Sequence, residues 1–458
     1  MISLSKVIEA TKGIVTGGGK DLLFNGVTTD SRSVCQGDLF IALAGENFDG
    51  HDYCETALNK GAAAVLVQKE LPNLPKAAVV IMVPDALNAY QQIAHAYRMA
   101  QKNIKVIAIT GSNGKTSTKD LIAACLAKKY KVVKTQANFN NEIGLPKTLL
   151  TIKPDTEVVV VEMGMRGFGQ IRALKELAEP DAVVITNVGE THMELLGSME
   201  NIAKAKSEIL ENMNEQQFAV LNNDDIYVSK MATSAEKLTY GIINDSSVRA
   251  SNVITSGNGT TFTYKSKITG NENFIKMPLI GMHNVMNALA AITVAEKMGV
   301  SDTDIETAFA EVRLTEKRQE ILRFGDITVI NDAYNASPAS MEAAMKTLAE
   351  VKKSAGAGRS IAVLADMLEL GESSEEAHRR VGDYIVRENI DFVIAYGKES
   401  RAIIDQAAKA GISAAYCADK EEAAIELKKH MQNNDIILFK GSHSMQVDKI
   451  IEMVFQNK

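Results

Sequence analysis

The segment ITGSNGKTSTKDLIAACLAKKY, residues 109–130, carries glycine, lysine and threonine at a spacing that suits the binding of phosphate. Its two glycines let the backbone approach an anion closely, while Lys115 can bridge phosphate oxygens and Thr116 can offer a hydroxyl to Mg²⁺. The widespread pattern G-x-x-x-x-G-K-[ST] would need glycine where this chain has Ile109. The segment therefore predicts a nucleotide site built on a shortened loop.

Two more polar groups follow apolar runs that are typical of buried parallel strands. Glu162 ends the run VVVVE, and His192 lies just beyond the run DAVVITNVG. Because ligands of α/β sheets bind at the carboxyl ends of strands, these side chains are expected near the phosphate loop. A carboxylate there can hold Mg²⁺ against phosphate. A single histidine is more often structural, but three polar groups at successive strand ends favour one shared site.

A third group of polar residues opens the helical segment GMHNVMNALAAITVAEKMG. His283, Asn284 and Asn287 are spaced three and four apart, which places them on one face of a helix. An asparagine amide donates and accepts at once, which suits the edge of adenine. The alternative is that these side chains only cap and pack the helix.

The elements that must position these residues alternate between strands and helices, which predicts an α/β protein of three domains. Residues 1–84 predict a small mixed α/β domain. Residues 85–314 predict a central P-loop ATPase-like domain with a mostly parallel sheet and a small antiparallel ribbon within residues 238–278. Residues 315–458 predict a Rossmann-like domain.

The composition excludes several classes of protein. A formal charge of −7 and the lack of any Lys/Arg run give no support for nucleic-acid binding. Four scattered cysteines without C-x-x-C pairing indicate neither a disulfide framework nor a zinc site. No 18-residue apolar run occurs, so we expect a cytoplasmic protein without membrane insertion. We also expect a monomer.

Six motifs, in order, resemble the Mur ligase family over nearly the whole chain. They are TGSNGKTS, VVEMG, NVGETHMELLGS with AKAKSEI, LNNDD, GMHNVMNALAA and DAYNASPASM. The short loop is the form that this family has. Within the family, TDSRSVCQGDLFIALAGENFDGHDY and NFNNEIGLP resemble the members that join D-alanyl-D-alanine to a UDP-N-acetylmuramoyl-tripeptide.

The resemblance implies an ATP-dependent ligase that works through an acyl phosphate. It implies a triphosphate held by Gly111, Ser112, Asn113, Gly114, Lys115, Thr116 and Ser117. It further implies two Mg²⁺ ions, one on Thr116 and Glu162, the other on His192 and a carbamylated lysine. Lys206 fits best for that lysine, but Lys204 stands two residues away. Residues two apart point to different sides of a helix, so only one can face the site.

The remaining contacts are also implied by the resemblance alone. Adenine is expected at His283, Asn284 and Asn287, and the rest of the nucleotide at Arg318 and Asp332. The substrates are expected at Asp30, Ser31, Arg32, Asn47, Asp49, His51, Asn138, Asn140, Asn141, Tyr334, Asn335 and Ser337, with the dipeptide also near residues 365–371. Completing the site from a separate domain implies closure on binding.

Two other interpretations share part of this pattern. A sister ligase, either the tripeptide-forming enzyme or folylpolyglutamate synthase, has the same ATP core. NFNNEIGLP and the absence of an Asp-Asn-Pro-x-Arg-like motif argue against it. A nucleotide-switch protein would be expected to carry Asn-Lys-x-Asp, which is absent. One departure from the family is His443, where arginine is more common, and we assign it no role.

Overall fold

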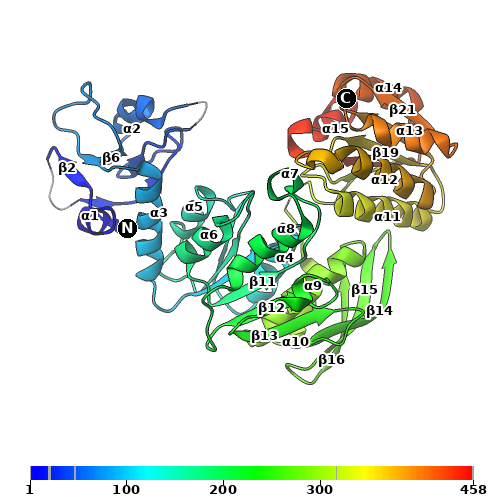
Figure 1. Ribbon diagram of the computed structural model, residues 1–458, viewed down its shortest axis with the longest axis horizontal. Coiled ribbons are helices and arrows are strands. Elements are labelled where there is room, and N and C mark those ends of the chain that lie inside the picture. The colour runs from blue at the N-terminus through cyan, green and yellow to red at the C-terminus, as the bar shows by residue number, and fades with distance from the viewer. Residues whose placement is uncertain (1, 19–21, 46–47, 316, 456–458) are drawn as a thin grey trace. The chain divides into compact units, whose positions relative to one another are not determined.

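The computed structural model describes residues 2–18, 22–45, 48–315 and 317–455. The chain divides into two compact units. Figure 1 labels the helices and strands that make them up. Unit 1 consists of Met1–Ala108, Lys131–Met163 and Arg172–Asp181. Unit 2 consists of Ile109–Tyr130, Gly164–Ile171 and Ala182–Lys458. Each unit is described by itself.

The N-terminal part of unit 1 is a small mixed α/β structure around a five-stranded sheet in the order β2-β7-β6-β5-β4. Its strands are β1 (Ile2–Ser3), β2 (Ile14–Thr16), β3 (Leu23–Phe24), β4 (Val27–Thr28), β5 (Leu39–Ile41), β6 (Ala64–Val67) and β7 (Val80–Met82). Its helices are α1 (Leu4–Thr11), η1 (Gly50–Tyr53), α2 (Cys54–Asn59) and α3 (Ala86–Met99). Tyr90 and Ile93 of α3 belong to the apolar core of this sheet, while the boundary between residues 84 and 85 stays a prediction.

The rest of unit 1 contains β9 (Val132–Lys134), α5 (Gly144–Leu149), β10 (Val158–Glu162) and most of α6 (Gln170–Ala178). Strand β8 (Lys105–Thr110) begins in unit 1 and ends in unit 2. Strands β9 and β10 pair in parallel, with Val160 opposite Lys134. All five residues of β10 are buried, as the run of β-branched residues predicts for a strand covered on both faces.

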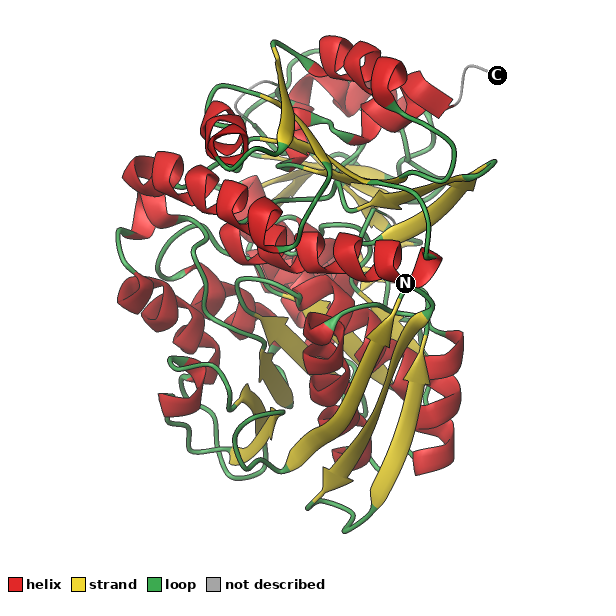
Figure 2. Ribbon diagram, turned by 90° about the vertical axis from the view of Figure 1, so that its right-hand side faces the viewer, coloured by secondary structure: helices red, strands yellow, loops and turns green. Residues whose placement is uncertain are grey.

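The middle part of unit 2 combines a parallel sheet with an antiparallel ribbon. Its strands are β11 (Ala182–Ile185), β12 (Phe218–Asn222), β13 (Glu236–Gly241), β14 (Val248–Ser256), β15 (Gly259–Ser266) and β16 (Glu272–Met277). Its helices are α4 (Lys115–Leu126), α7 (Met193–Leu196), α8 (Met199–Ser207), η2 (Glu208–Leu210), η3 (Val228–Lys230), α9 (Met282–Lys297) and α10 (Asp302–Glu311). Strands β11 to β14 pair in parallel, and β14 to β16 form the antiparallel ribbon seen as three long strands in Figure 2.

The predicted ribbon is confirmed with one difference at its start. Residues 238–241 lie in β13, which pairs in parallel with β12, so the antiparallel part begins only at β14. Alternation of polar and β-forming residues predicts a strand but not the direction of its partner.

The C-terminal part of unit 2 has a six-stranded sheet in the order β17-β18-β22-β19-β20-β21. Its strands are β17 (Glu320–Phe324), β18 (Ile327–Asn331), β19 (Ser360–Ala365), β20 (Phe392–Tyr396), β21 (Ser413–Cys417) and β22 (Ile436–Lys440). Its helices are α11 (Pro338–Ala355), η4 (Gly371–Ser373), α12 (Ser374–Arg387), α13 (Arg401–Lys409), α14 (Lys420–His430), η5 (His443–Met445) and α15 (Asp448–Phe455). All strands after β17 are parallel, and β21-β20-β19-β22 follows the 3-2-1-4 order of doubly wound folds. The predicted Rossmann-like order is therefore confirmed.

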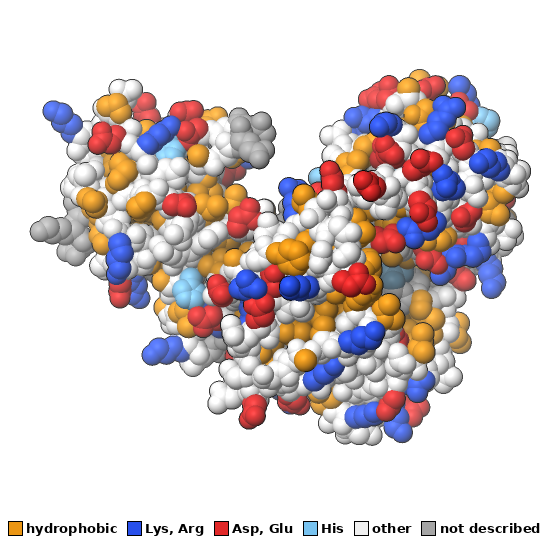
Figure 3. Space-filling model, in the orientation of Figure 1, with side chains coloured by type: hydrophobic (Ala, Val, Ile, Leu, Met, Phe, Trp, Pro, Cys, Tyr) orange, Lys and Arg blue, Asp and Glu red, His pale blue; other side chains and the backbone are white. Residues whose placement is uncertain are grey.

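Helices cover both faces of this sheet, as Figure 1 shows for α11 and α12 on one side and α14 and α15 on the other. Leu364 of β19 packs in a cluster with Met345 of α11, whereas its neighbour Val363 packs with Leu427 of α14. The alternation places successive strand residues on opposite faces and buries both. On the face shown in Figure 3, acidic and basic side chains are interspersed. Among the described residues, no helix is long and apolar enough to cross a membrane.

Candidate functional site

The phosphate loop connects β8 to α4, and two of its glycines have backbone conformations that other residues rarely adopt. Gly111 has φ +149° and Gly114 has φ +78°. A Cβ atom on Gly111 would lie 1.9 Å from Thr186 Oγ1, and one on Gly114 would lie 2.4 Å from Asn287 Oδ1. Both positions therefore require glycine, for conformation and for space.

The loop is braced against the segment that follows β11. The backbone N–H groups of Ser112 and Asn113 donate to Asn187, to its carbonyl oxygen at 2.9 Å and its Oδ1 at 2.9 Å. The Thr186 hydroxyl donates to the Asn113 carbonyl at 2.6 Å. Ser112 Oγ also accepts from the N–H of Gly189 at 2.8 Å. These bonds fix the loop at the start of α4, where the first N–H groups of the helix have no carbonyl partner within the helix and attract anions.

Lys115 folds back over this loop. Its ammonium donates to the carbonyl of Gly111 at 2.8 Å and to that of Ser112 at 3.2 Å. Lys115 and Thr116 are the first two residues of α4, the position that a phosphate-binding loop of this type gives to its lysine and threonine. Thr116 and Ser117 are buried in that turn.

The two lysines of AKAKS differ sharply in their surroundings. Lys206 is only 2% exposed, whereas Lys204 is exposed and lies 5.9 Å from the ring centroid of Phe168. Burial lowers the pKa of Lys206 well below that of an ordinary lysine, and the charge of Lys115 adds to the shift. The geometry supports Lys206 rather than Lys204 as the lysine that faces the site.

His192 begins α7 in the left-handed region, with φ +57°. Its Nδ1 lies 2.5 Å from Oε2 of Glu369, in the loop that follows β19. The pKa of His192 is lowered, mainly by burial. The nearby charges of Lys206 and Lys115 lower it further, whereas Glu369 raises it. His192, Lys206 and Lys115 thus form one electrostatically linked group within unit 2.

Glu162 lies in unit 1, at the end of β10. Its carboxylate accepts from the amide of Asn140 at 2.9 Å, and its N–H donates to Thr135 Oγ1 at 3.1 Å. Asn141 instead caps α5, because its Oδ1 accepts from the N–H of Gly144 at 2.8 Å. Asn138 is exposed. Of the three asparagines predicted to contact substrate, Asn140 is the one that donates a hydrogen bond to Glu162, the predicted metal ligand.

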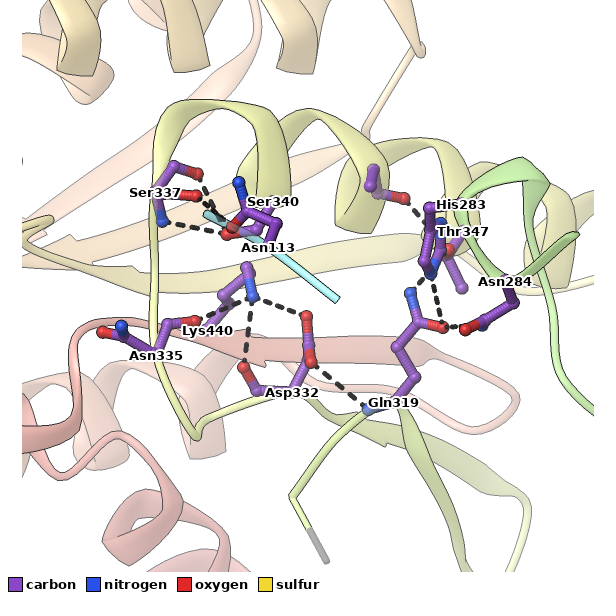
Figure 4. Close-up of polar contacts among 11 residues, drawn as sticks. Asn113, His283, Asn284, Gln319, Asp332, Asn335, Ser337, Ser340, Thr347 and Lys440 are labelled. Atoms are coloured by element: carbon purple, nitrogen blue, oxygen red, sulfur yellow. Dashed lines mark hydrogen bonds and ion pairs between the residues drawn. The ribbon is translucent and has the colours of Figure 1, made fainter. Parts of the chain in front are cut away.

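The start of α9 holds a connected set of amides, shown in Figure 4. The Gln319 side-chain oxygen accepts from Asn284 Nδ2 at 3.0 Å and lies 3.1 Å from Nε2 of His283. Asn287 donates to Asn284 Oδ1 at 3.3 Å and accepts from Thr118 at 3.2 Å. The three residues predicted to read the base thus lie together, but the His283 ring and the two asparagine amides all interact with other side chains of the protein. This arrangement also fits the alternative role of capping and packing.

A second polar group of Figure 4 surrounds the loop after β18. The buried ammonium of Lys440 lies 2.6 Å from Asp332 Oδ2 and donates to the Asn335 carbonyl at 3.0 Å. Further along the loop, the Ser337 hydroxyl donates to Asn113 Oδ1 at 2.8 Å. The predicted nucleotide contact Asp332 is therefore fixed by a buried cation, and its loop touches the phosphate loop.

Arg318 precedes this group in the chain. Its guanidinium carbon lies 3.9 Å from the ring centroid of Tyr334, and its buried Nε has no hydrogen-bond partner among the residues that the structure describes. The ring of Tyr334 lies 5.8 Å from that of His443. The guanidinium thus lies against the ring of Tyr334, a contact that suits the planar side chain of arginine.

The predicted UDP contacts lie at the surface of unit 1. Arg32 is 88% exposed and pairs with Asp30 at 2.8 Å, which lowers the Asp30 pKa to about 2. The carbonyl of Ser31 accepts from Lys60 at 3.0 Å. Asn47 lies outside the described residues.

Asp49 and His51 form a separate cluster. Asp49 accepts from Lys69 at 2.6 Å and from His51 Nδ1 at 2.5 Å, and these bonds lower the Asp49 pKa. His51 is buried, and its Nε2 accepts from the N–H of Gln68 at 3.1 Å. Both ring nitrogens are therefore engaged, which favours a structural role for His51.

Sequence reasoning missed two side chains at these sites, Gln319 and Lys440, and it expected the loop 365–371, which contains Glu369, near the dipeptide and not at His192. Each of these three side chains contacts a predicted residue that is distant in the chain, and no local motif marks any of these contacts. Among the described residues, no three His, Cys, Asp or Glu side chains cluster as metal ligands do. The predicted metal ligands include a threonine and a modified lysine, which lie outside that set.

Family models match most of the chain in three parts. Residues 23–98 match the model described as Mur ligase family, catalytic domain. Residues 109–295 match the Mur ligase middle domain, and residues 317–443 match the Mur ligase, glutamate ligase domain. The chain belongs to the Mur ligase family and has its three domains.

Two relatives that match over nearly the full chain have the same name. A Bacillus subtilis protein named UDP-N-acetylmuramoyl-tripeptide–D-alanyl-D-alanine ligase is 39% identical, with 99% of this chain and 98% of that protein covered. The Escherichia coli protein of the same name is 33% identical, with 100% and 99% covered. A crystal structure of MurF from Acinetobacter baumannii superposes with a TM-score of 0.90 at 26% identity, covering 99% of this chain and 98% of that one.

One similar solved structure contains nucleotide. MurF ligase from Thermotoga maritima, in complex with ADP, matches with a TM-score of 0.83 at 26% identity, covering 96% of this chain and 99% of that one. This similarity supports the use of ATP by the present chain.

Proposed function

We propose that this chain is an ATP-dependent ligase that adds D-alanyl-D-alanine to UDP-N-acetylmuramoyl-tripeptide. The products are UDP-N-acetylmuramoyl-pentapeptide, ADP and phosphate, in the synthesis of peptidoglycan precursors. The observation that carries the proposal is the match over 99% of the chain to a relative of that name at 39% identity. The enzyme belongs to the acid–D-amino-acid ligases, and we expect a cytoplasmic monomer.

The reaction has two steps whose demands match the residues described. The tripeptide carboxylate attacks the γ-phosphorus of ATP, which releases ADP and forms an acyl phosphate. The amine of D-alanyl-D-alanine then attacks the acyl carbon, loses a proton and expels phosphate. Each step brings anions together, so the site must neutralise charge and exclude water. Lys115 and the first turn of α4 are proposed to neutralise the triphosphate, which is supported by the position of Lys115 at the start of α4 and over the loop.

Two Mg²⁺ ions are proposed, one at Thr116 and Glu162 and one at His192 and Lys206. Hydroxyl, carboxylate and carbamate oxygens suit Mg²⁺, and the imidazole would complete the second set. Bound Mg²⁺ would neutralise phosphate charge. Lys206 fits this role through its burial, because burial lowers its pKa and so favours the neutral amine, the form that reacts with CO₂. The amine nitrogen bonds to the CO₂ carbon and releases one proton, which leaves an anionic carbamate.

The remaining nucleotide contacts come from α9 and the C-terminal domain. His283, Asn284 and Asn287 are proposed for adenine, which requires that the base replace or join the bonds to Gln319. Arg318 and Asp332 are proposed for phosphate and ribose, and neighbours hold both, the ring of Tyr334 for Arg318 and the ammonium of Lys440 for Asp332. Gly111, Ser112, Asn113, Gly114 and Ser117 would surround the triphosphate with Lys115.

UDP-N-acetylmuramoyl-tripeptide and D-alanyl-D-alanine are proposed to contact different domains. Asp30, Ser31, Arg32, Asn47, Asp49 and His51 are assigned to the UDP end, although the burial of His51 favours support of Asp49 over direct contact. Asn138, Asn140 and Asn141 are assigned to the sugar and peptide. Tyr334, Asn335 and Ser337 are assigned to the dipeptide, together with the loop after β19.

The test is phosphate release by the purified protein. With ATP and Mg²⁺, release should need both UDP-N-acetylmuramoyl-tripeptide and D-alanyl-D-alanine. The Lys115→Ala variant should be slower by about 100-fold or more with an unchanged fold by circular dichroism. Release with a different amino acid in place of the dipeptide would favour a sister ligase. Release that needs only a protein or nucleic acid would favour a nucleotide switch.

A further inference from the structure

The loop after β19 reaches from the C-terminal domain to His192 of the middle domain. Oε2 of Glu369 lies 2.5 Å from Nδ1 of His192. The carbonyl oxygen of Glu369 accepts from the N–H of Glu194 at 3.4 Å. A Cβ atom on Gly371 would lie 3.1 Å from Cα of Glu194, so the two backbones are close. One short loop thus contacts the His192 segment through side chain and backbone.

The loop is held in place by its own domain rather than by the contact with His192. The N–H of Met367 donates to Nε2 of His378 at 2.9 Å, and the N–H of Leu368 donates to Oγ of Ser442 at 2.9 Å. Glu369 itself has φ +62°, which costs a residue with a side chain about 1–3 kcal/mol unless its surroundings impose it. The bonds of the two preceding residues supply that constraint.

The hydrogen bond determines which nitrogen of His192 is available to a metal. An ionised carboxylate only accepts, so Nδ1 must donate to Glu369. The neutral ring then presents the lone pair of Nε2, and histidines that bind metals are oriented in this way by a carboxylate or carbonyl at the other nitrogen. We propose that Glu369 is the positioning residue for His192, fixing its tautomer and ring orientation for the metal ion in the site.

The other partner of Glu369 does not explain its placement. Arg166 Nε lies 3.7 Å from Oε1, but the arginine side chain is 73% exposed, and exposed pairs contribute little. His192, by contrast, is largely covered and separated from Glu369 by 177 residues. The orientation of a middle-domain ligand therefore depends on the C-terminal domain, which links metal binding to the docking of that domain. This inference rests on the metal role proposed for His192.

The test uses the full chain with Glu369→Ala, Glu369→Gln and, as a matched control, Glu375→Ala. Glu375 is a carboxylate six residues away that pairs only with Arg379 on the exposed face of α12 among its described contacts. Titration of Mn²⁺ by electron paramagnetic resonance in the presence of ADP measures metal binding. ¹⁵N spectra of histidine-labelled protein without metal report the tautomer of His192, assigned with His192→Gln.

We expect Glu369→Ala to weaken Mn²⁺ binding about 10–100-fold and to change the His192 tautomer signal. Glu369→Gln should restore much of both, because its amide oxygen still accepts from Nδ1. Glu375→Ala should leave both unchanged. An unchanged tautomer signal in Glu369→Ala would overturn the inference, as would lost turnover with normal Mn²⁺ binding. Equal Mn²⁺ binding by His192→Gln and the parent would refute the metal assignment itself, while the metal-free spectra still report on Glu369.

Discussion

At the scale of single residues, the most informative side chain is Lys206. Burying a lysine is unfavourable unless its charge is removed or compensated, so a buried lysine beside the proposed metal ligand His192 calls for a chemical reason. Conversion to a carbamate turns the cation into an anion that a metal can bind. The neighbouring Lys204, which is exposed, provides a comparison within the same helix.

Replacing Lys206 with alanine should lower kcat by about 100-fold or more, because one ligand of the site is lost. Short carboxylic acids such as acetate or propionate should restore part of the activity by filling the space with a carboxylate. Lys204→Ala should retain activity close to the parent. Phosphate release by the three proteins, with and without added acid, measures this. Loss of activity in Lys204→Ala instead would show that the other lysine faces the site.

The same residue predicts a pH dependence of stability. The lowered pKa of Lys206 means that the unfolded chain binds more protons than the folded one between that pKa and the ordinary value of 10.5. Stability should therefore rise with pH in this window, by about 1.4 kcal/mol per pH unit from this group. Lys206→Met, of similar size, should be more stable than the parent at the acidic end of this window and lose its advantage as pH approaches 10.5.

Urea unfolding of the two proteins in CO₂-free buffer at several pH values measures the difference in the free energy of unfolding. Using the difference cancels the contributions of all other groups. A difference that stays constant from pH 7 to pH 10 would show that Lys206 is not neutralised by folding.

At the scale of elements, the sequence predicted those parts of the fold and the site that are formed by residues close together in the chain. The turn between β8 and α4, Glu162 at the end of β10 and the doubly wound order follow from short motifs and strand periodicity. The contacts of Gln319, Lys440 and Glu369 could not be predicted, because their partners His283, Asp332 and His192 lie 36, 108 and 177 residues away in the chain. Such contacts depend on how helices and loops pack, which no local pattern encodes.

Gly114 allows the element-scale argument to be tested. Gly114→Ala should destabilise the protein by about 1–3 kcal/mol through its φ of +78°, and should weaken ADP binding because the new Cβ would lie 2.4 Å from Asn287. Gly197→Ala is the matched control, since Gly197 has φ +76° and an added Cβ would meet nothing within 4 Å. Chemical unfolding and ADP titration should show similar destabilisation but weaker ADP binding only for Gly114→Ala. Equal ADP affinities would mean that the contact with α9 does not shape the phosphate site.

At the scale of the whole molecule, most predicted contacts of ATP and the predicted contacts of UDP-N-acetylmuramoyl-tripeptide fall into different units. The phosphate loop, α9 and the C-terminal domain belong to unit 2, whereas the TDSR turn and NFNNEIGLP belong to unit 1. Glu162, in unit 1, is the exception among the predicted groups around the nucleotide. The proposed substrate contacts therefore come from both units.

Each ligand should therefore stabilise the protein through a different set of residues. ADP with Mg²⁺ at 100 times its Kd adds about 2.7 kcal/mol to the native state, which corresponds to a rise of roughly 3 °C in Tm for a chain of this length. UDP-N-acetylmuramoyl-tripeptide at the same relative concentration should give a shift of similar size. Lys115→Ala should remove the ADP shift and retain the UDP-substrate shift, while Arg32→Ala should do the reverse. Differential scanning calorimetry of the three proteins with each ligand measures this, and loss of both shifts in either variant would show that the two sites are not separable as the division into units predicts.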